Sequence, residues 1–138
     1  MASFIYQGPV RGQERPRFGQ GRTYESDKAK AYKDDLASAY RAQDGTRFEK
    51  GTPVAVFIHA FRPLPKDRPK RVVSEPWTVK PDADNVAKAV LDALNGVAWA
   101  DDSQVVRVTV WKHERTRDQV EGMRVFVTDA REATGEGF

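Results

Sequence analysis

Apolar side chains recur along the first half of the chain in patterns that predict a strand, a helix and a second strand. Residues 3–7 combine aromatic and β-branched side chains, which favours a short strand. Residues 26–41 carry apolar side chains at helical spacing and begin with Ser26, a favourable N-cap. The stripe of this helix consists of Ala29, Tyr32, Leu36, Ala39 and Tyr40. Residues 53–61 form a nearly continuous apolar run, which is typical of a central strand buried on both faces.

The second half of the chain repeats the helical pattern once and then alternates as strands do. A helix is expected over residues 84–95, with Gly96 just past its end. Its core-facing stripe consists of Val86, Val90, Ala93 and Leu94. Alternating side chains in 104–113 and again in 123–128 predict two strands, joined by a hairpin loop at 116–122.

Two long stretches, residues 8–24 and 62–81, lack apolar periodicity, and we expect both to be loops without regular elements. The element order is then β-α-β-α-β-β. This order predicts an α+β fold in a single domain over residues 1–138, with a mixed β-sheet packed against two helices.

Composition narrows the chemistry that such a domain can carry. The 138 residues include no cysteine, which excludes disulfides, thiolate metal sites and cysteine nucleophiles. The only two histidines are His59 and His113, so a multi-histidine zinc site is not expected, and neither residue is assigned a catalytic role. Any metal chemistry must then rest on carboxylates, which favour hard cations such as Mg²⁺ or Mn²⁺.

The distribution of charge and of apolar residues indicates which partners the protein can bind. Residues 1–75 hold 15 Lys and Arg against 9 Asp and Glu, whereas residues 76–138 hold 8 against 11. This asymmetry suits a protein that grips a polyanion with one surface and holds metal on another, although ordinary solvated charge would produce it too. No stretch approaches the roughly 20 apolar residues that span a bilayer, and the start lacks a signal-peptide pattern. We expect a cytoplasmic, intracellular protein with no membrane partner, and leave a phage, prophage or cellular origin open.

Candidate chemistry concentrates around the second helix. Asp82 and Asp84 lie two residues apart at its non-helical entry, so their oxygens can point at one cation. Lys88 follows Asp84 at i+4, where it could steer a phosphate or stabilise developing negative charge. A second pair, Asp101 and Asp102, sits between the helix and the next strand. If the chain returned there to the start of the helix, the carboxylates would converge in an arrangement that Mg²⁺ prefers.

Each of these residues also has a structural explanation. A single Asp82 or Asp84 is commonly an N-cap, the 101–102 pair a solvated turn, and Lys88 a surface lysine. A cap needs one aspartate rather than two, however, and clustered like charges are destabilising unless a cation binds them. Spacing alone therefore leaves metal binding and a structural role open.

One long segment resembles a known family. The pattern Lys80-Pro-Asp-Ala-Asp-Asn-x-x-Lys-Ala-x-x-Asp-Ala-Leu-Asn-Gly96, followed by Trp99 and Asp101-Asp-Ser-Gln-Val105, resembles the signature of the RusA family of Holliday-junction resolvases. The stretch Arg15-Pro-Arg-Phe-Gly-x-Gly-Arg-Thr-Tyr24 is similar to the N-terminal region of that family. With the element order, the resemblance covers most of the chain. The departure is the 62–81 loop, which is longer than in the shorter family members.

The resemblance implies a homodimeric, Mg²⁺-dependent endodeoxyribonuclease that resolves Holliday junctions by paired symmetric nicks, with a metal-activated water attacking the phosphodiester. Its implied catalytic residues are Asp82, Asp84, Lys88 and Asp102. Its implied metal ligands are Asp82, Asp84, Asp101 and Asp102, with Asp101 either a ligand or a supporting carboxylate beside the others. The cofactor would be Mg²⁺, with Mn²⁺ as a substitute and no small-molecule cofactor. The partners would be four-way and other branched DNA.

Two basic loops flank the expected site, and contact between such loops and phosphates is chiefly electrostatic. The residues expected to bind DNA are Arg15, Arg17, Arg22, Lys66, Arg68, Lys70, Arg71 and Lys80. Their alternative role is to solubilise the loops. Two alternative functions stay open: a non-catalytic branched-DNA-binding protein, which needs no convergent carboxylates, and a Mg²⁺-dependent nucleotide hydrolase, which needs no basic loops.

Overall fold

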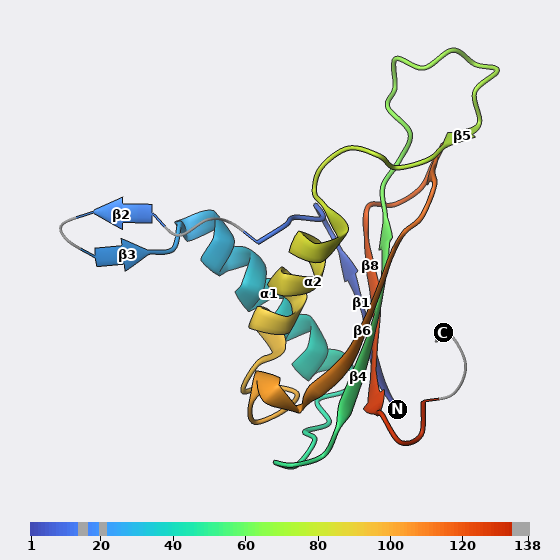
Figure 1. Ribbon diagram of the computed structural model, residues 1–138. Helices are drawn as coiled ribbons and strands as arrows, with labels where there is room; N and C mark the ends of the chain where they lie inside the picture. Colours follow the sequence, from blue (N-terminus) through green and yellow to red (C-terminus); the bar gives the residue numbers. More distant parts are fainter. Residues whose placement is uncertain (14–16, 20–21, 134–138) are drawn as a thin grey trace.

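The computed structural model describes residues 1–13, 17–19 and 22–133 and, at residues 17, 18 and 22–24, the backbone alone. Its helices are α1 (Asp27–Gln43), α2 (Ala83–Leu94) and the short 3₁₀ turn η1 (Asp102–Gln104). Its strands are β1 (Ala2–Gln7), β2 (Arg17–Gly19), β3 (Arg22–Tyr24), β4 (Val54–Phe61), β5 (Ser74–Glu75), β6 (Val105–Lys112), β7 (Arg115–Thr116) and β8 (Gly122–Asp129). Both long helices lie on one side of the main sheet (Figure 1).

The main sheet has four strands in the order β1-β8-β4-β6. β4 pairs in parallel with β6, whereas β8 pairs antiparallel with both β1 and β4. The sheet is therefore mixed, and with its two helices it confirms the predicted α+β fold. Because β4 and β6 are parallel, their C-terminal ends lie at the same edge of the sheet, and this is the edge at which α2 begins (Figure 1).

The helical stripes read from the sequence are the ones that pack on the sheet. Buried side chains include Tyr32, Leu36 and Tyr40 of α1 and Val86, Val90, Ala93 and Leu94 of α2. The Phe4 ring of β1 meets Tyr40 edge-on, with ring centroids 5.7 Å apart. Burying one large apolar side chain contributes about 1.5–3 kcal/mol, so a rotation of either helix would cost several such contributions. This packing fixes the direction in which α2 presents its polar face.

β4 is buried along most of its length, as its apolar run predicted. Residues 54–58 are at most 1% exposed, because β8 and β6 flank the strand and side chains cover both of its faces. The helix-free face carries an aromatic group made of Phe57, His59, Phe61, Trp111, His113 and Phe126. The two imidazoles bond to each other across 2.8 Å, and burial lowers the pKa of His113. Both histidines thus lie across the sheet from α2.

The two stretches expected to be loops contain short strands, and that expectation was wrong in this respect. β2 pairs with β3 as an antiparallel hairpin within 8–24, and β5 in 62–81 pairs with β7. Strands of two or three residues are too short to leave an alternating pattern, and their pairing depends on partners elsewhere in the chain. In the described part of the chain, no helix has the length and apolar character needed to cross a bilayer.

Candidate active site

The entry to α2 presents two exposed carboxylates. Asp82 occupies the N-cap position with extended backbone angles, yet its side chain makes no capping hydrogen bond. Asp84 lies in the first turn, and its Oδ2 is 3.8 Å from the Nζ of Lys88. The side chains of Asp84 and Lys88 keep 70% and 64% of their accessible surface. The i+4 relation inferred from the sequence is thus present, and neither aspartate is used as a cap.

The segment that leads into α2 is held by cationic side chains from the ends of the parallel strands. Arg62 follows β4 and donates to the backbone oxygen of Lys80 at 3.0 Å. Lys112 ends β6 and donates to the backbone oxygen of Val79 at 2.8 Å. Both cations lie over the buried ring of Trp77, at 4.5 Å and 5.1 Å from its centroid. These contacts fix the approach to Asp82, and the Lys80–Pro81 peptide within it is cis.

Lys112 is a residue of this site that the sequence pattern did not reveal. Burial lowers the pKa of its ammonium group, and the nearby charge of Asp82 raises it. Its proximity to Asp82 follows from the parallel pairing of β4 and β6, which brings the last residue of β6 to the edge where α2 starts. The only signal in the sequence was a lysine at the end of a strand.

The second carboxylate pair lies at the opposite end of α2. The helix has 12 residues, so its two ends are about 18 Å apart at 1.5 Å per residue. Asp101 forms a capping box with Gln104 at the start of η1, and Asp102 accepts a 2.9 Å hydrogen bond from the indole of Trp99. Gln104 in turn donates to the backbone of Glu49 and Thr52, just before β4.

The sequence left open whether the Asp101–Asp102 pair meets Asp82 and Asp84 at one site. Within one chain, the two pairs do not meet. The connection after α2 runs to the start of β6, and β6 then carries the chain back toward Asp82 with Lys112 rather than with the aspartates (Figure 1). Among the residues that the structure describes, no group of three or more acidic or histidine side chains is placed to hold a metal ion. The physical reason is the polarity of the strand: the 101–102 pair precedes β6 and so lies at its far end.

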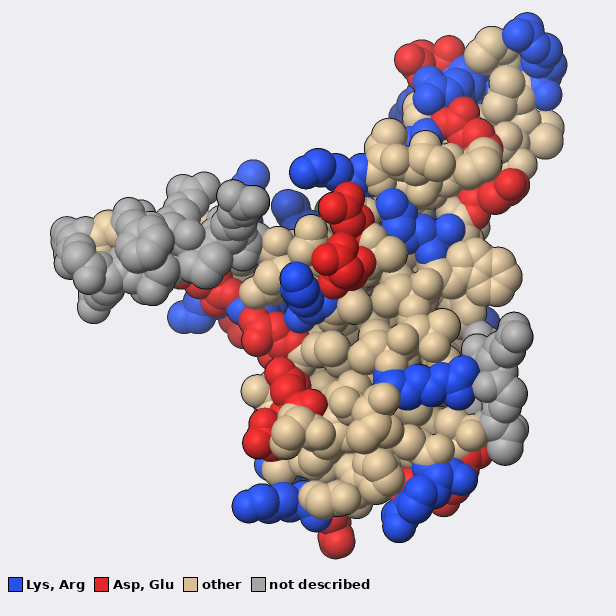
Figure 2. Space-filling model, viewed as in Figure 1, with Lys and Arg blue, Asp and Glu red and all other residues tan. Residues whose placement is uncertain are grey.

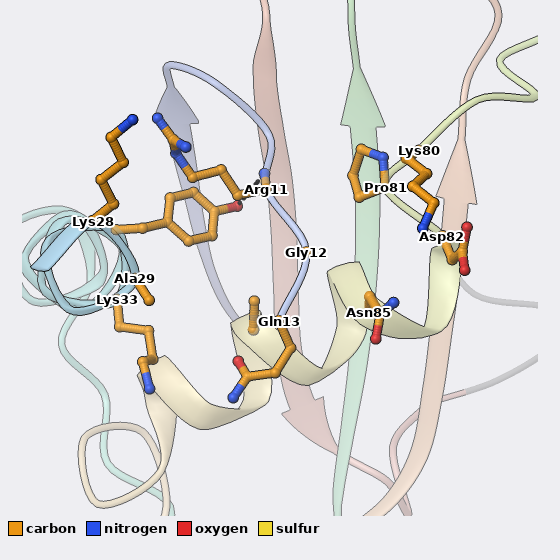
Figure 3. Close-up of a pocket in the computed structure, with 12 residues that line it drawn as sticks. Arg11, Gly12, Gln13, Lys28, Ala29, Lys33, Lys80, Pro81, Asp82 and Asn85 are labelled. Atoms are coloured by element: carbon orange, nitrogen blue, oxygen red, sulfur yellow. Dashed lines mark hydrogen bonds between the residues drawn. The ribbon is translucent and has the colours of Figure 1, made fainter. Parts of the chain in front are cut away.

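A cavity of about 440 Å³ opens beside Asp82, between the N-terminal parts of α1 and α2 (Figure 3). Four cationic side chains line it: Arg11, Lys28, Lys33 and Lys80. The Arg11–Gln13 segment crosses between the helices, and the backbone N–H of Gln13 donates to the backbone oxygen of Asn85 at 2.9 Å. A Cβ at Gly12 would lie 2.9 Å from that of Asn85, so the close approach requires glycine. The cavity thus places positive charge next to Asp82.

Comparison with known protein families identifies the family of this chain. The model of the family described as endodeoxyribonuclease RusA matches residues 7–127, most of the chain. The chain belongs to the RusA family. It is similar to the uncharacterized protein YqaN of Bacillus subtilis (strain 168), with 33% identity over 129 residues that cover 86% of this chain and 91% of YqaN. The RusA family consists of endodeoxyribonucleases that act on Holliday junctions, and the chain is accordingly a nuclease.

The basic residues expected to bind DNA fall into three groups on this RusA fold. Arg15 lies outside the described residues, and Arg17 and Arg22 lie in the β2–β3 hairpin with their side chains outside the description. Lys80 lines the cavity beside Asp82. The remaining group belongs to the 62–81 loop, where the side chains of Lys66, Lys70 and Arg71 are exposed and that of Arg68 is bound to Glu75 (Figure 2).

The donor set at the mouth of α2 fits a hard cation. Asp82 and Asp84 offer exposed carboxylate oxygens, and Mg²⁺ is typically held by one or two carboxylates with water and phosphate oxygens completing its coordination. Asp101 and Asp102 offer the same donor type, although each already accepts a local hydrogen bond. Within one chain, the residues that fit the metal are therefore Asp82 and Asp84.

Proposed function

We propose that this RusA-family nuclease resolves Holliday junctions as a Mg²⁺-dependent homodimer, with Mn²⁺ able to replace Mg²⁺, and that residues 1–138 act as one nuclease domain. The observation that carries the proposal is the mouth of α2. Two exposed aspartates there make no capping bond, and Lys88, Lys112 and the basic cavity surround them. A structural role does not require carboxylates that are left available in this way.

The residues at this mouth would divide the work of phosphodiester hydrolysis. Asp82 and Asp84 would hold Mg²⁺, which supplies an activated water and polarises the scissile phosphate. Lys88 would place its ammonium against the attacked phosphate, while its contact with Asp84 limits its range of positions. Lys112 would add positive charge near Asp82 and keep the lead-in segment in place.

The position of Asp102 supports a site shared between two chains. Asp101 and Asp102 lie about one length of α2, roughly 18 Å, from Asp82 in the same chain. A two-fold axis that sets two α2 helices antiparallel would bring the start of one helix to the end of the other and repeat this contact twice. We propose that Asp102 of a second copy, supported by Asp101, completes each metal site. Two equivalent sites would then make the two symmetric nicks.

The shared site can be tested without activity, because the chain has no cysteine. Ala83→Cys and Ser103→Cys place single thiols at exposed positions beside the two carboxylate pairs. When the two variants are mixed, a short bismaleimide should link them into a heterodimer. Ala83→Cys mixed with Arg41→Cys, a surface position on α1, is the matched control and should not be linked. Equal linkage in both mixtures would contradict the shared site.

The overall function is tested by nicking of a labelled four-way junction beside a matched linear duplex, each with Mg²⁺ and with EDTA. The proposal predicts paired symmetric nicks in the junction alone, and no nicks in EDTA. Tight junction binding without cutting in either Mg²⁺ or Mn²⁺ would support a non-catalytic branched-DNA-binding protein instead.

A further inference from the structure

An arm made of residues 62–75 and 113–121 projects from the edge of the sheet where α2 begins (Figure 1). Its spine is the β5–β7 pair, extended by a 2.9 Å hydrogen bond from the backbone of Leu64 to that of Thr116. Basic side chains gather at its far end in Figure 2. The arm thus carries positive charge well beyond the body of the molecule, on the side of the candidate active site.

The Glu75 carboxylate binds arginines from both halves of the arm. Glu75 accepts two hydrogen bonds from Arg68, at 3.0 Å and 3.1 Å, and a further one from Arg115. The hydrogen bond from Arg68 is the main cause that holds the pKa of Glu75 below its usual value, so the carboxylate is charged at neutral pH. Arg115 is 8% exposed and is therefore not available to a ligand. Glu75 thus closes the 62–75 loop through a fork-like pair of hydrogen bonds with Arg68, and it joins this loop to the 113–121 segment through Arg115.

The Arg117 side chain binds the backbone of the 62–75 loop. Its guanidinium donates to the carbonyl oxygens of Val72, Arg68 and Pro69, at 3.0 Å, 3.2 Å and 2.6 Å. Three carbonyls gathered on one planar cation fix the turn that follows Arg68. Without these bonds the loop would lose more backbone conformational entropy when a ligand ordered it.

We propose that the arm is a preorganised grip for the DNA sugar-phosphate backbone, in which exposed Lys66, Lys70 and Arg71 contact phosphates while Glu75 and Arg68 are positioning residues. This inference rests on the proposed action on DNA and reassigns Arg68 from contacting DNA to shaping the arm. The duplex that leads away from the junction would lie along the arm, next to the strand cut at Asp82. Preorganisation raises affinity because the ordering cost is met before binding.

Glu75 provides a test in which the two explanations predict opposite signs. If the arm acted only through its net charge, Glu75→Gln would remove a negative charge near DNA and tighten binding. If Glu75 positions the arm, the same change should weaken junction binding by about 3- to 10-fold, because the loop must then be ordered on binding. Asp118→Asn is the matched control, since Asp118 is exposed in the same arm and its positive φ also suits asparagine.

A second variant separates the roles of Arg68. If Arg68 only contacted a phosphate, lysine could take over that contact. Lysine cannot reproduce the paired hydrogen bonds that Arg68 makes to Glu75. Arg68→Lys should therefore weaken binding as Glu75→Gln does and leave the salt dependence near that of the wild type. Lys70→Ala should instead make the plot of the log binding constant against log salt concentration less steep, by about the amount that one phosphate contact contributes. Trypsin should cut the arm faster in both positioning variants than in the wild type.

The decisive experiment is a fluorescence-anisotropy titration of a four-way junction with these proteins at several salt concentrations, without Mg²⁺. Weaker binding by Glu75→Gln and Arg68→Lys, with Asp118→Asn equal to or tighter than the wild type, would establish the positioning role. Unchanged or tighter binding by Glu75→Gln would overturn it while leaving the proposed nuclease function intact. A wild-type protein that binds no junction would overturn both.

Discussion

The two ends of α2 carry the same kind of side chain in opposite circumstances. At the start, Asp82 occupies the N-cap position, but its side chain makes no capping bond. In the described part of the chain, the one salt bridge of Asp84 is with the ammonium group of Lys88. At the end, Asp101 caps a turn and Asp102 accepts a bond from Trp99. The first pair is available to a ligand, whereas the second pair also serves the fold. The contrast indicates which carboxylates a metal can use at no structural cost.

The largest effect should come from the available pair. Asp82→Asn or Asp84→Asn should reduce junction cutting by about 10³-fold or more, because the metal loses a ligand. Junction binding should persist or tighten, since a negative charge near DNA is removed. Nicking rates and anisotropy titrations measure the two properties separately. Asp92→Asn, on the same helix but bonded to Lys33, is the control and should still cut. Equal losses of binding and cutting in Asp82→Asn would contradict a catalytic role.

An intermediate effect is expected at Lys112, whose ammonium carries charge beside Asp82. Lys112→Met should slow cutting by about tenfold, and Lys112→Arg should retain most of the rate. Since the pKa of Lys112 is lowered by burial, the charged form is lost as pH rises through a value below that of an ordinary lysine. Cutting should therefore decline on the alkaline side in the wild type. The decline should be absent in Lys112→Arg, and its persistence there would assign it to another group.

The smallest effect concerns stability and tests the contrast itself. Asp101→Ala removes a capping box and should lower the free energy of unfolding by about 1 kcal/mol. Asp82→Ala removes no capping bond and should leave this free energy unchanged or slightly higher. Urea denaturation of both variants measures the difference. A larger loss for Asp82→Ala would mean that the mouth of α2 is held by its carboxylates.

The sequence was sufficient for the elements that bury a regular stripe. Helical spacing identified α1 and α2, and the apolar run identified β4, because burial of these side chains dominates the free energy of packing. The family signature and the pairing of Asp84 with Lys88 could also be read along one helix, where neighbours are set by a fixed period.

The remaining features depend on how strands pair, which no local pattern encodes. The parallel alignment of β4 with β6 places Lys112 beside Asp82 and leaves Asp102 at the far edge. The bond between Arg68 and Glu75 likewise arises from a two-residue strand pair. Thus the sequence could identify the four aspartates as candidate metal ligands. It could not show that Asp82 and Asp84 lie far from Asp101 and Asp102 within one chain.

Subunit complementation is the sharpest test of whether two chains build each active site. Asp82→Asn and Asp102→Asn are each expected to be inactive, and they are mixed under conditions that allow subunits to exchange. Every mixed dimer then holds one site with both wild-type aspartates if the sites are shared, so single-strand nicking of the junction should reappear at a fraction of the wild-type rate. If each chain carries a complete site, both sites of a mixed dimer are defective. A mixture as inactive as its components, with exchange verified by a size tag, would mean that the two chains do not share their active sites.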